Sequence, residues 1–291
     1  MVDILPCNER FEELLQFVAR LNCQPAHHIG YFDETPAAIR ETLRELRPPA
    51  QETFHLAMDE GRLVGVLGLE IDPEIGRVWL FGPLIEHADW QALADRLYAA
   101  VRPLIPAAIH EHELFGDVKN VHLQEFAERH AFPLLGEHAI LELKRAEFMG
   151  ARRPRLSADQ YRPGLFEQLE RLHDELFPHT YLTARQMVER QNENKKLFVM
   201  VNEDVLQGYV FCKVEPESGE GYIDFIGVAG PYQGQGIGRQ LLAAALGWIF
   251  SVPGIEKVAE TVNASNARAL KLYAEFDFVI MHTMKGYRLK V

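Results

Sequence analysis

The sequence predicts an α+β protein built from two copies of one domain, each with a mixed, mostly antiparallel central sheet flanked by helices. The first observation behind this prediction is internal similarity: residues 54–70 align with 197–215, 77–84 with 222–229, and 120–143 with 266–289. The blocks keep their order at offsets of 143, 145 and 146 residues, which indicates a duplicated domain rather than a solenoid. The second observation is the mixture of helical and strand patterns within each copy, which is typical of this fold class.

The helices expected near the start of each copy carry recognisable signals. In the first copy, Thr35 is placed to cap a helix whose first residue is Pro36. In the second copy, leucines at positions 165, 169, 172 and 176 have the spacing of one helical face. Thr183 and Gln186 then have capping-box spacing at the start of another helix.

The strand patterns follow these helices in both copies. Residues 54–70 and 197–215 each predict strand, acidic turn and strand, and 77–84 and 222–229 each predict a third strand. A helix, a strand, a helix and a final strand pair then complete each copy. Between the copies, residues 144–160 are basic and interrupted by Gly150 and Pro154, so we expect a solvated connector there. The predicted domains are therefore residues 1–148 and 155–291.

The composition is ordinary for a soluble globular protein, with 47% hydrophobic and 25% charged residues in 291. The formal net charge of −12 disfavours nucleic acid or an anionic membrane as the main partner, because both need a basic face. Cys7, Cys23 and Cys212 have no spacing that suggests a metal site or a disulfide framework. The longest apolar run, residues 241–250, is about half a membrane span, and the start lacks a signal-peptide pattern. We expect a cytoplasmic protein, either a monomer or a homodimer.

A glycine-rich loop lies between the expected strand at 223–229 and the expected helix at about 237–250, with Gly230, Gly234, Gly236 and Gly238. This order predicts an anion site, because N–H groups at a helix start lack internal partners and glycines allow close approach. The loop has no Gly-Lys-Ser/Thr, so it is not a P-loop, and its glycine spacing is not that of a dinucleotide fingerprint. It fits the pattern Gln-x-x-Gly-x-Gly, which begins at Gln233.

This loop resembles that of the GCN5-related N-acetyltransferase (GNAT) superfamily. Residues 258–278 are similar to the next block of the superfamily, a strand, Asn, helix, Tyr and Gly-Phe, with Asn263, Asn266, Tyr273 and Phe278 in place. Asp277 stands where glycine is usual, and aspartate tolerates the left-handed conformation. The resemblance covers about residues 155–291 and extends weakly to the first copy. It implies GNAT-like domains and an acetyl-CoA-dependent N-acetyltransferase.

The resemblance also implies a place for acetyl-CoA. The loop and helix start would hold its pyrophosphate, and the preceding strand would offer backbone groups to the pantetheine and the acetyl carbonyl. The implied cofactor-binding residues are Ile226, Gly227, Val228, Gln233, Gly234, Gln235, Gly236, Ile237, Gly238, Arg239, Asn266, Ala269 and Tyr273. In the first copy, the matching residues 86–96 contain no glycine, and Ala127 aligns with Tyr273. We therefore expect the first copy to be degenerate and to support the second or shape the substrate cleft.

Transfer of acetyl to an amine needs a deprotonated amine, stabilisation of the carbonyl oxygen and a proton for the leaving thiolate. The resemblance assigns the second task to a backbone N–H in residues 226–228 and the third to Tyr273, although this tyrosine could instead be a core residue with its hydroxyl occupied. The base is open between Asp224, Glu260 and a water chain. Asp224 has the parity of Ile226 and Val228 in the motif strand, which favours a functional carboxylate. With a reference pKa of about 3.9 it is a weak base, so it would act through water or bind the substrate ammonium.

Two further groups of residues are candidate sites. His110 and His112 could form half of a metal site, but no third ligand has a recognisable spacing, so we expect no metal. His179, Thr180 and Tyr181 join two expected helices near the side where acceptors enter GNAT domains, so they are candidates for acceptor binding or for capping that turn. The expected acceptor is a primary amine of a small molecule or peptide. The alternatives are a non-catalytic acyl-CoA-binding or regulatory protein and an acyltransferase that uses a longer acyl-CoA.

Overall fold

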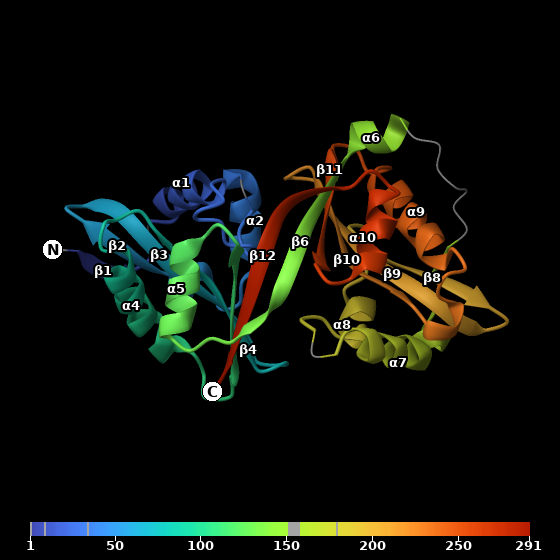
Figure 1. The fold of residues 1–291 in the computed structure, drawn as a ribbon, viewed down its shortest axis with the longest axis horizontal. Helices are drawn as coiled ribbons and strands as arrows, with labels where there is room; N and C mark the ends of the chain where they lie inside the picture. Colours follow the sequence, from blue (N-terminus) through green and yellow to red (C-terminus); the bar gives the residue numbers. More distant parts are fainter. Residues whose placement is uncertain (1, 9, 34, 151–157, 179) are drawn as a thin grey trace. The chain divides into compact units, whose positions relative to one another are not determined.

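A computed structural model describes all residues of the chain except 1, 9, 34, 151–157 and 179 (Figure 1). The chain divides into two compact units, and each is described by itself below. Unit 1 consists of residues 1–138 together with 282–291, and unit 2 consists of residues 139–281.

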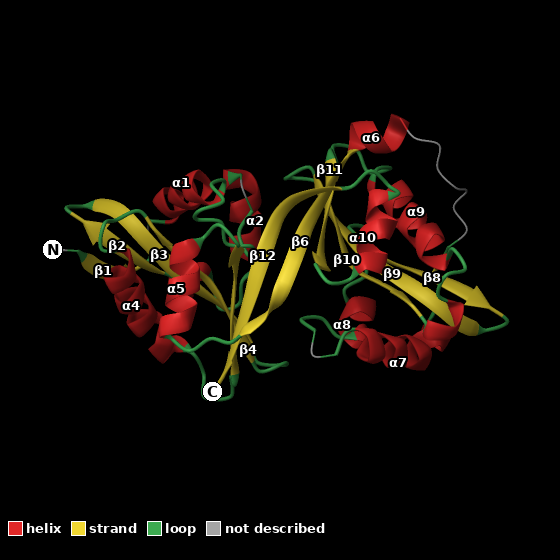
Figure 2. Cartoon of the chain, in the orientation of Figure 1, coloured by secondary structure: helices red, strands yellow, loops and turns green. Residues whose placement is uncertain are grey.

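Both units contain helices and strands (Figure 2). The first copy contains β1 (Asp3–Pro6), α1 (Phe11–Asn22), α2 (Pro36–Glu45), α3 (Ala50–Thr53), β2 (His55–Asp59), β3 (Arg62–Asp72), β4 (Arg77–Ile85), α4 (Trp90–Val101), the 3-10 turn η1 (Arg102–Leu104), β5 (Glu111–Asp117), α5 (Val121–Arg129) and β6 (Leu134–Lys144). The remainder contains α6 (Arg145–Gly150), β7 (Asp159–Gln160), η2 (Pro163–Leu165), α7 (Phe166–Leu176), α8 (Ala184–Glu189), β8 (Lys195–Asn202), β9 (Val205–Glu215), β10 (Glu220–Val228), η3 (Gly230–Tyr232), α9 (Ile237–Ile249), β11 (Lys257–Asn263), α10 (Ala267–Ala274) and β12 (Val279–Lys290).

Both units contain the predicted mixed sheet. In unit 1 the strand order is β1-β2-β3-β4-β5-β12, and every pair is antiparallel except β4 with β5. In unit 2 the order is β7-β8-β9-β10-β11-β6, where β10 and β11 are parallel and the pairs from β7 to β10 are antiparallel. The prediction of an α+β protein with a mixed, mostly antiparallel sheet in each half is confirmed.

The ends of β6 and β12 are exchanged between the two copies of the sequence. Residues 282–290 of β12 belong to unit 1, where Met284–Lys290 pair with β5 in antiparallel register. Residues 139–144 of β6 belong to unit 2, next to β11. The compact units therefore differ from the sequence-based domains 1–148 and 155–291, because the internal repeat shows where the copies begin and end but not with which sheet a strand pairs.

Apolar side chains of successive residues in the strands of unit 2 point to opposite faces of its sheet, and they form one apolar cluster on each face. Leu197, Val199, Tyr209 and Phe211 pack with α7 and α8, whereas Phe198, Val210, Cys212 and Val214 pack with α9 and α10. In unit 1 one large cluster is formed by β2 to β5 with helices such as α1 and α4. Figures 1 and 2 show α7 and α8 on the opposite side of β8 and β9 from α9.

The predicted helix starts are confirmed. The Thr35 side chain accepts a hydrogen bond from the N–H of Ala38, with Pro36 as first helical residue. Thr183 and Gln186 form a complete capping box at α8. Asp277 has φ 67°, the left-handed conformation expected where it replaces glycine.

The basic segment between the copies is ordered and mostly exposed at its start, with Ala146 and Glu147 exposed and Arg145 partly buried. Its first residues form α6, and Arg145 donates to three main-chain carbonyls, those of Ile255, Phe250 and Val252, at 2.5, 2.8 and 3.0 Å. Because two of these carbonyls, those of Phe250 and Val252, lie at or just beyond the C-terminus of α9, the guanidinium completes the end of that helix. Most of the rest of the segment, residues 151–157, lies outside the described residues.

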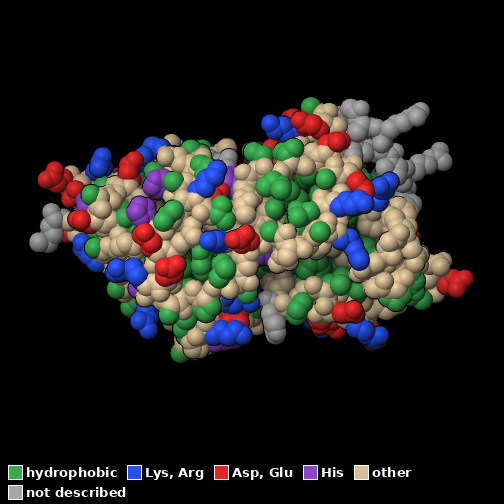
Figure 3. Space-filling view, in the orientation of Figure 1, with side chains coloured by type: hydrophobic (Ala, Val, Ile, Leu, Met, Phe, Trp, Pro, Cys, Tyr) green, Lys and Arg blue, Asp and Glu red, His purple; other side chains and the backbone are tan. Residues whose placement is uncertain are grey.

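Two surface properties bear on possible partners. Within the described residues, no helix is long and apolar enough to cross a membrane. On the face drawn in Figure 3, lysine and arginine side chains are interspersed with acidic ones rather than gathered in a continuous basic band.

Candidate active site

The glycine loop of unit 2 leads from β10 through η3 into α9. Gly234 and Gly236 have φ of 79° and 80°, which side chains other than glycine rarely adopt. A Cβ atom at either position would meet no atom within 4 Å, so the space beside both backbones is open. Gly238 is different, because its φ is not positive and a Cβ there would lie 3.4 Å from Leu272 of α10. The loop therefore presents bare backbone on one side and packs toward α10 on the other.

Six consecutive backbone N–H groups in this loop, from Gly234 to Arg239, have no acceptor among the described residues. The next N–H, that of Gln240, donates to the Gly236 carbonyl at 3.1 Å and begins the ladder of α9. Unpaired N–H groups at a helix start carry the positive end of the helix dipole and favour a bound anion. These unpaired N–H groups are the backbone feature on which the predicted anion site depends.

The two glutamines of the loop hold its shape. Gln233 donates to the Val228 carbonyl at 3.0 Å, and its side-chain oxygen accepts a hydrogen bond from Arg268 of α10. Gln235 donates to the Pro231 carbonyl at 3.1 Å. Gln233 therefore connects the end of β10, the loop and the start of α10.

Other predicted cofactor-binding residues surround the same loop. Ile237 is buried as the first residue of α9, and Arg239 forms an ion pair with Glu275. Asn266 caps α10, where its side chain accepts from the N–H of Ala269 at 3.0 Å. Its counterpart Asn120 makes the same cap on α5 at 3.1 Å, so this residue accounts for a helix start in both copies. Contact of Asn266 with a cofactor stays a prediction.

Strands β10 and β11 separate just beyond their paired ends. Their parallel register covers Glu220, Gly221 and Tyr222 with Lys257, Val258 and Ala259, and no further pairs follow. Among the described residues, the part of β10 from Ile223 to Val228 pairs with β9 alone. Half of the backbone groups of Ile226, Gly227 and Val228 therefore lack a strand partner, and apart from the Val228 carbonyl, which accepts from Gln233, these groups are available to a ligand.

Asp224 lies at an irregularity of β10. The register shifts between Ile223 and Phe225, and these two neighbours pack in different apolar clusters. The simple alternation from which the sequence placed Asp224 beside Ile226 and Val228 is therefore wrong at this point, because a bulge inserts an extra residue. The structure instead brings Tyr181 to this carboxylate, with its hydroxyl 3.0 Å from Asp224 Oδ1.

Glu260 and Tyr273 form the enclosed part of the site. Tyr273 is 1% exposed, and among the described residues neither its hydroxyl nor Glu260 Oε2 has a partner in hydrogen-bonding geometry. Burial raises the pKa of Glu260 well above its usual range, and the nearby Asp224 carboxylate adds to this. Burial and the nearby Glu260 carboxyl also raise the pKa of Tyr273, so its phenol stays protonated at neutral pH. The three predicted catalytic residues thus act on one another electrostatically.

The predicted acceptor residues fall on the segment between α7 and α8. Tyr181 is 44% exposed and packs against Phe225, with ring centroids 5.1 Å apart. Thr180 is partly buried in the same segment. His179 lies outside the described residues.

Sequence reasoning missed His173, which positions this segment. His173 is 1% exposed in α7, with Nδ1 2.5 Å from the Tyr209 hydroxyl and Nε2 2.7 Å from the Leu182 carbonyl. Burial lowers its pKa, so the imidazole is neutral and uses one nitrogen as donor and the other as acceptor. The signal in the sequence was a histidine four residues after Leu169, on the apolar face of the helix.

The equivalent region of unit 1 has a different structure. Only residues 86–89 separate β4 from α4, and they contain Glu86 and Asp89 but no glycine. Glu86 forms an ion pair with Arg20 at 2.8 Å. All nine residues of β4 are buried, whereas burial alternates along β10. Acidic side chains at the start of α4 disfavour an anion there.

The two histidines considered for metal binding are separated by their surroundings. His112 is buried in β5, with Nδ1 3.3 Å from the Tyr98 hydroxyl, whereas His110 precedes the strand and is exposed. Among the described residues, no three His, Cys, Asp or Glu side chains are grouped so that they could hold a metal ion.

Comparison with known proteins agrees with this geometry. Residues 166–278 match the sequence profile of the acetyltransferase (GNAT) family, and they include the glycine loop, Asp224, Glu260 and Tyr273. The chain contains a GNAT acetyltransferase domain. N-alpha-acetyltransferase 50 from Danio rerio is 28% identical over 140 residues, which are 47% of this chain and 82% of that protein. The GNAT match supports acyltransferase activity in general.

Solved structures extend the likeness over the whole chain. A GCN5-related N-acetyltransferase from Sphaerobacter thermophilus has a TM-score of 0.74 at 17% identity, covering 99% of this chain and 95% of that chain. A tandem GNAT protein from the clavulanic acid biosynthesis pathway has a TM-score of 0.67 at 15% identity, covering 100% and 98%. At these identities the likeness shows the fold alone, so the GNAT-like fold continues beyond the residues matched by the family profile.

Proposed function

We propose that unit 2 is an N-acetyltransferase that transfers acetyl from acetyl-CoA to a primary amine of a small molecule or peptide. The observation that carries this proposal is the run of six unpaired N–H groups from Gly234 to Arg239 among the described residues. Together with the open space beside Gly234 and Gly236, they fit the diphosphate of a CoA thioester. When bound, acetyl-CoA would supply an activated acyl group and a thiolate leaving group.

The side chains beyond the separated strands fit the remaining chemistry. Tyr273 keeps its proton at neutral pH, and its hydroxyl lies beside the Glu260 carboxyl without a hydrogen bond of good geometry, so it can give that proton to a leaving thiolate. Asp224 and Glu260 can bind an ammonium group and accept its proton directly or through water. The raised pKa of Glu260 makes its carboxylate, once deprotonated, a better proton acceptor than an ordinary glutamate.

The corresponding region of unit 1 differs from the candidate site of unit 2, which supports the assignment of the function to unit 2. Its corresponding loop is short and acidic, its corresponding strand is buried throughout, and Ala127 replaces the tyrosine. We propose that this copy has no acyl-CoA site and that each chain binds one acetyl-CoA.

Isothermal titration with acetyl-CoA tests the cofactor site. We expect one site per chain in the native protein and loss of binding in Gly236→Val. Gly254→Val is the matched control, because Gly254 also has positive φ and open space beside it but lies outside the loop. Two sites per chain would contradict the proposal for unit 1, and absence of binding would contradict the proposal for unit 2.

Amine-dependent release of CoA thiol separates an enzyme from a protein that only binds acyl-CoA. We expect release to rise with a panel of primary amines and to need acetyl-CoA in preference to longer acyl-CoA. Binding without release for any small amine or peptide amine would instead favour a regulatory acyl-CoA-binding protein. Faster release from longer donors would favour a different acyltransferase.

A further inference from the structure

Strands β6 and β12 are equivalent in the internal repeat, yet each closes the sheet of the other copy. β12 lies beside β5 in unit 1, and residues 139–144 of β6 lie beside β11 in unit 2. The repeat aligns the two strands at an offset of 146 residues, so Glu142 corresponds to Arg288. At this position the two strands therefore carry opposite charges.

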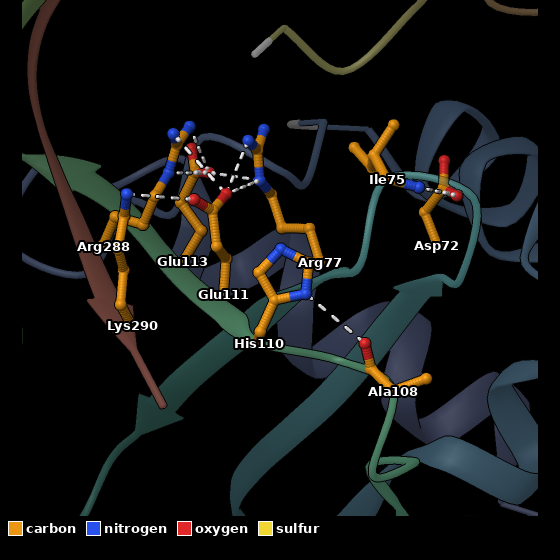
Figure 4. A network of polar contacts seen from close by, with 9 residues as sticks. All are labelled: Asp72, Ile75, Arg77, Ala108, His110, Glu111, Glu113, Arg288 and Lys290. Atoms are coloured by element: carbon orange, nitrogen blue, oxygen red, sulfur yellow. Dashed lines mark hydrogen bonds and ion pairs between the residues drawn. The ribbon is translucent and has the colours of Figure 1, made fainter.

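In unit 1, Arg288 faces two carboxylates of β5 (Figure 4). Its guanidinium is 3.0 Å from Glu113 and 3.6 Å from Glu111. Arg77 of β4 lies 2.7 Å from Glu111 and 3.4 Å from Glu113. None of these four side chains is more than 16% exposed, so solvent screens the cluster little. Without β12, the cluster on β4 and β5 would hold two carboxylates and one guanidinium.

In unit 2, the same arrangement occurs with every sign reversed. Lys257 of β11 lies 3.0 Å from Glu220 of β10 and 3.2 Å from Glu142 of β6. Lys257 corresponds to Glu111 at the offset of 146, and Glu220 and Arg77 are the strand partners of these two residues. Across three strands, the order of charges is positive, negative, positive in unit 1 and negative, positive, negative in unit 2.

Two further residues of β12 have partners that their counterparts in β6 could not bind. Lys285 donates to Gln124 at 2.8 Å, and its counterpart Ala139 is 3% exposed in the apolar cluster of unit 2. His282 lies 2.9 Å from Asp117, whereas its counterpart is Gly136. A lysine in place of Ala139 would be buried among apolar side chains, which is unfavourable.

We propose that the inverted charges of Glu142 and Arg288 decide which strand closes each sheet and thereby specify the exchange. If each copy kept its own last strand, Glu142 would face Glu111 and Glu113, and Arg288 would face Lys257. Opposite charges across neighbouring strands stabilise a sheet, and like charges in the same places destabilise it. The two strands also differ in apolar content, as at Ala139 and Lys285, and the inverted charges act in the same direction as this difference. Attraction in the correct pairing and repulsion in the wrong one together supply the specificity.

Cross-strand disulfides can report which strand lies beside β5. Leu289 is the register partner of His112, and Leu143 is the counterpart of Leu289. Register partners on antiparallel strands are within disulfide range. In a Cys23→Ser background refolded from urea, we expect L289C/H112C to cross-link and L143C/H112C not to cross-link.

Exchange of the two charges should redirect the pairing. We expect E142R/R288E to raise the yield of the L143C/H112C cross-link relative to that of the L289C/H112C cross-link at least tenfold over the same ratio without the exchange. The cross-linked peptides are measured by mass spectrometry after proteolysis without reduction. An unchanged ratio would overturn the proposal. A second comparison keeps the test decisive if the exchanged variant folds poorly.

The second comparison uses the directly opposed pair of Arg288 and Glu113. R288E should lower the melting temperature, and E113K/R288E should recover most of that loss, because the pair is attractive again with its signs reversed. K290E is the matched control, since the Lys290 side chain is 80% exposed and 3.7 Å from Glu111, and it should change the melting temperature little. The proposal would be overturned if the melting temperature of E113K/R288E were equal to or lower than those of the single variants R288E and E113K.

Discussion

Replacement of Tyr273 by phenylalanine should separate catalysis from stability. The hydroxyl of Tyr273 is buried beside the Glu260 carboxyl but is not in hydrogen-bonding geometry with any described residue, so its removal breaks no well-formed hydrogen bond. A buried hydroxyl without a partner costs about 1–3 kcal/mol of desolvation. We therefore expect Tyr273→Phe to unfold with a free energy equal to that of the native protein or up to about 1–3 kcal/mol higher. The ring stays in place, so its contact with Phe278 is kept.

The same substitution should lower turnover strongly if Tyr273 is the proton donor. Loss of a positioned general acid typically reduces kcat by about 10²–10⁴-fold. Binding of acetyl-CoA should change little, because the loop of unpaired N–H groups is untouched. The assays are thiol release for kcat, titration for acetyl-CoA affinity and urea unfolding for stability.

Tyr222→Phe is the matched control in the same unit. The Tyr222 hydroxyl donates to Glu220 at 2.6 Å, a bond to a charged group that contributes about 1.5–3 kcal/mol. This variant should lose stability and keep its kcat. If Tyr273→Phe instead lost as much stability as Tyr222→Phe and kept kcat within about twofold, Tyr273 would be a core residue with an occupied hydroxyl, and the assignment as acid would be refuted.

Three further predictions concern the loop, the buried carboxyl and the acceptor segment. Gly236→Ala should lower the unfolding free energy by about 1–2 kcal/mol because of its positive φ, whereas Gly238→Ala should be neutral or slightly stabilising in urea unfolding; equal losses would contradict this reading of the loop. Because the pKa of Glu260 is raised in the folded protein, the native chain should lose stability relative to Glu260→Gln as the pH rises from about 4.3 through the raised pKa, and parallel pH curves would refute the burial of this carboxyl. His173→Phe should cost at least about 1–3 kcal/mol by leaving the Leu182 carbonyl unpaired, and should raise KM for the amine but not for acetyl-CoA; an unchanged amine KM would contradict the positioning role.

The local features of the fold were predictable because they depend on neighbouring residues. Thr35, Thr183 and Asp277 each act within one turn of the backbone, and the structure confirms all three. The glycine loop was equally accessible, since its conformation follows from Gly234 and Gly236 themselves. Such signals need no knowledge of distant segments.

The features that the sequence did not predict depend on tertiary pairing. The bulge at Asp224 is a property of the register between β9 and β10, and a period-two pattern cannot reveal it. The contacts of His173 join α7 to β9 and to the segment before α8. The exchange of β6 and β12 was hidden by the repeat itself, because the two strands align with each other without a gap. Residues that differ between the strands, such as Glu142 and Arg288 or Ala139 and Lys285, distinguish the two arrangements.

The exchange gives the first copy a structural role in unit 2 even though its own loop lacks glycine. Strand β11, which carries Glu260, pairs with β10 over only three residues and has β6 as its other neighbour. Leu141 and Leu143 of β6 are 3% and 1% exposed in the apolar cluster that also contains Tyr273. Burial of two leucines contributes about 3–6 kcal/mol, a large share of the roughly 5–15 kcal/mol that stabilises a typical domain. The strand that supports both candidate catalytic groups thus comes from the first copy, so residues 155–291 alone would lack part of the structure on which the candidate site depends.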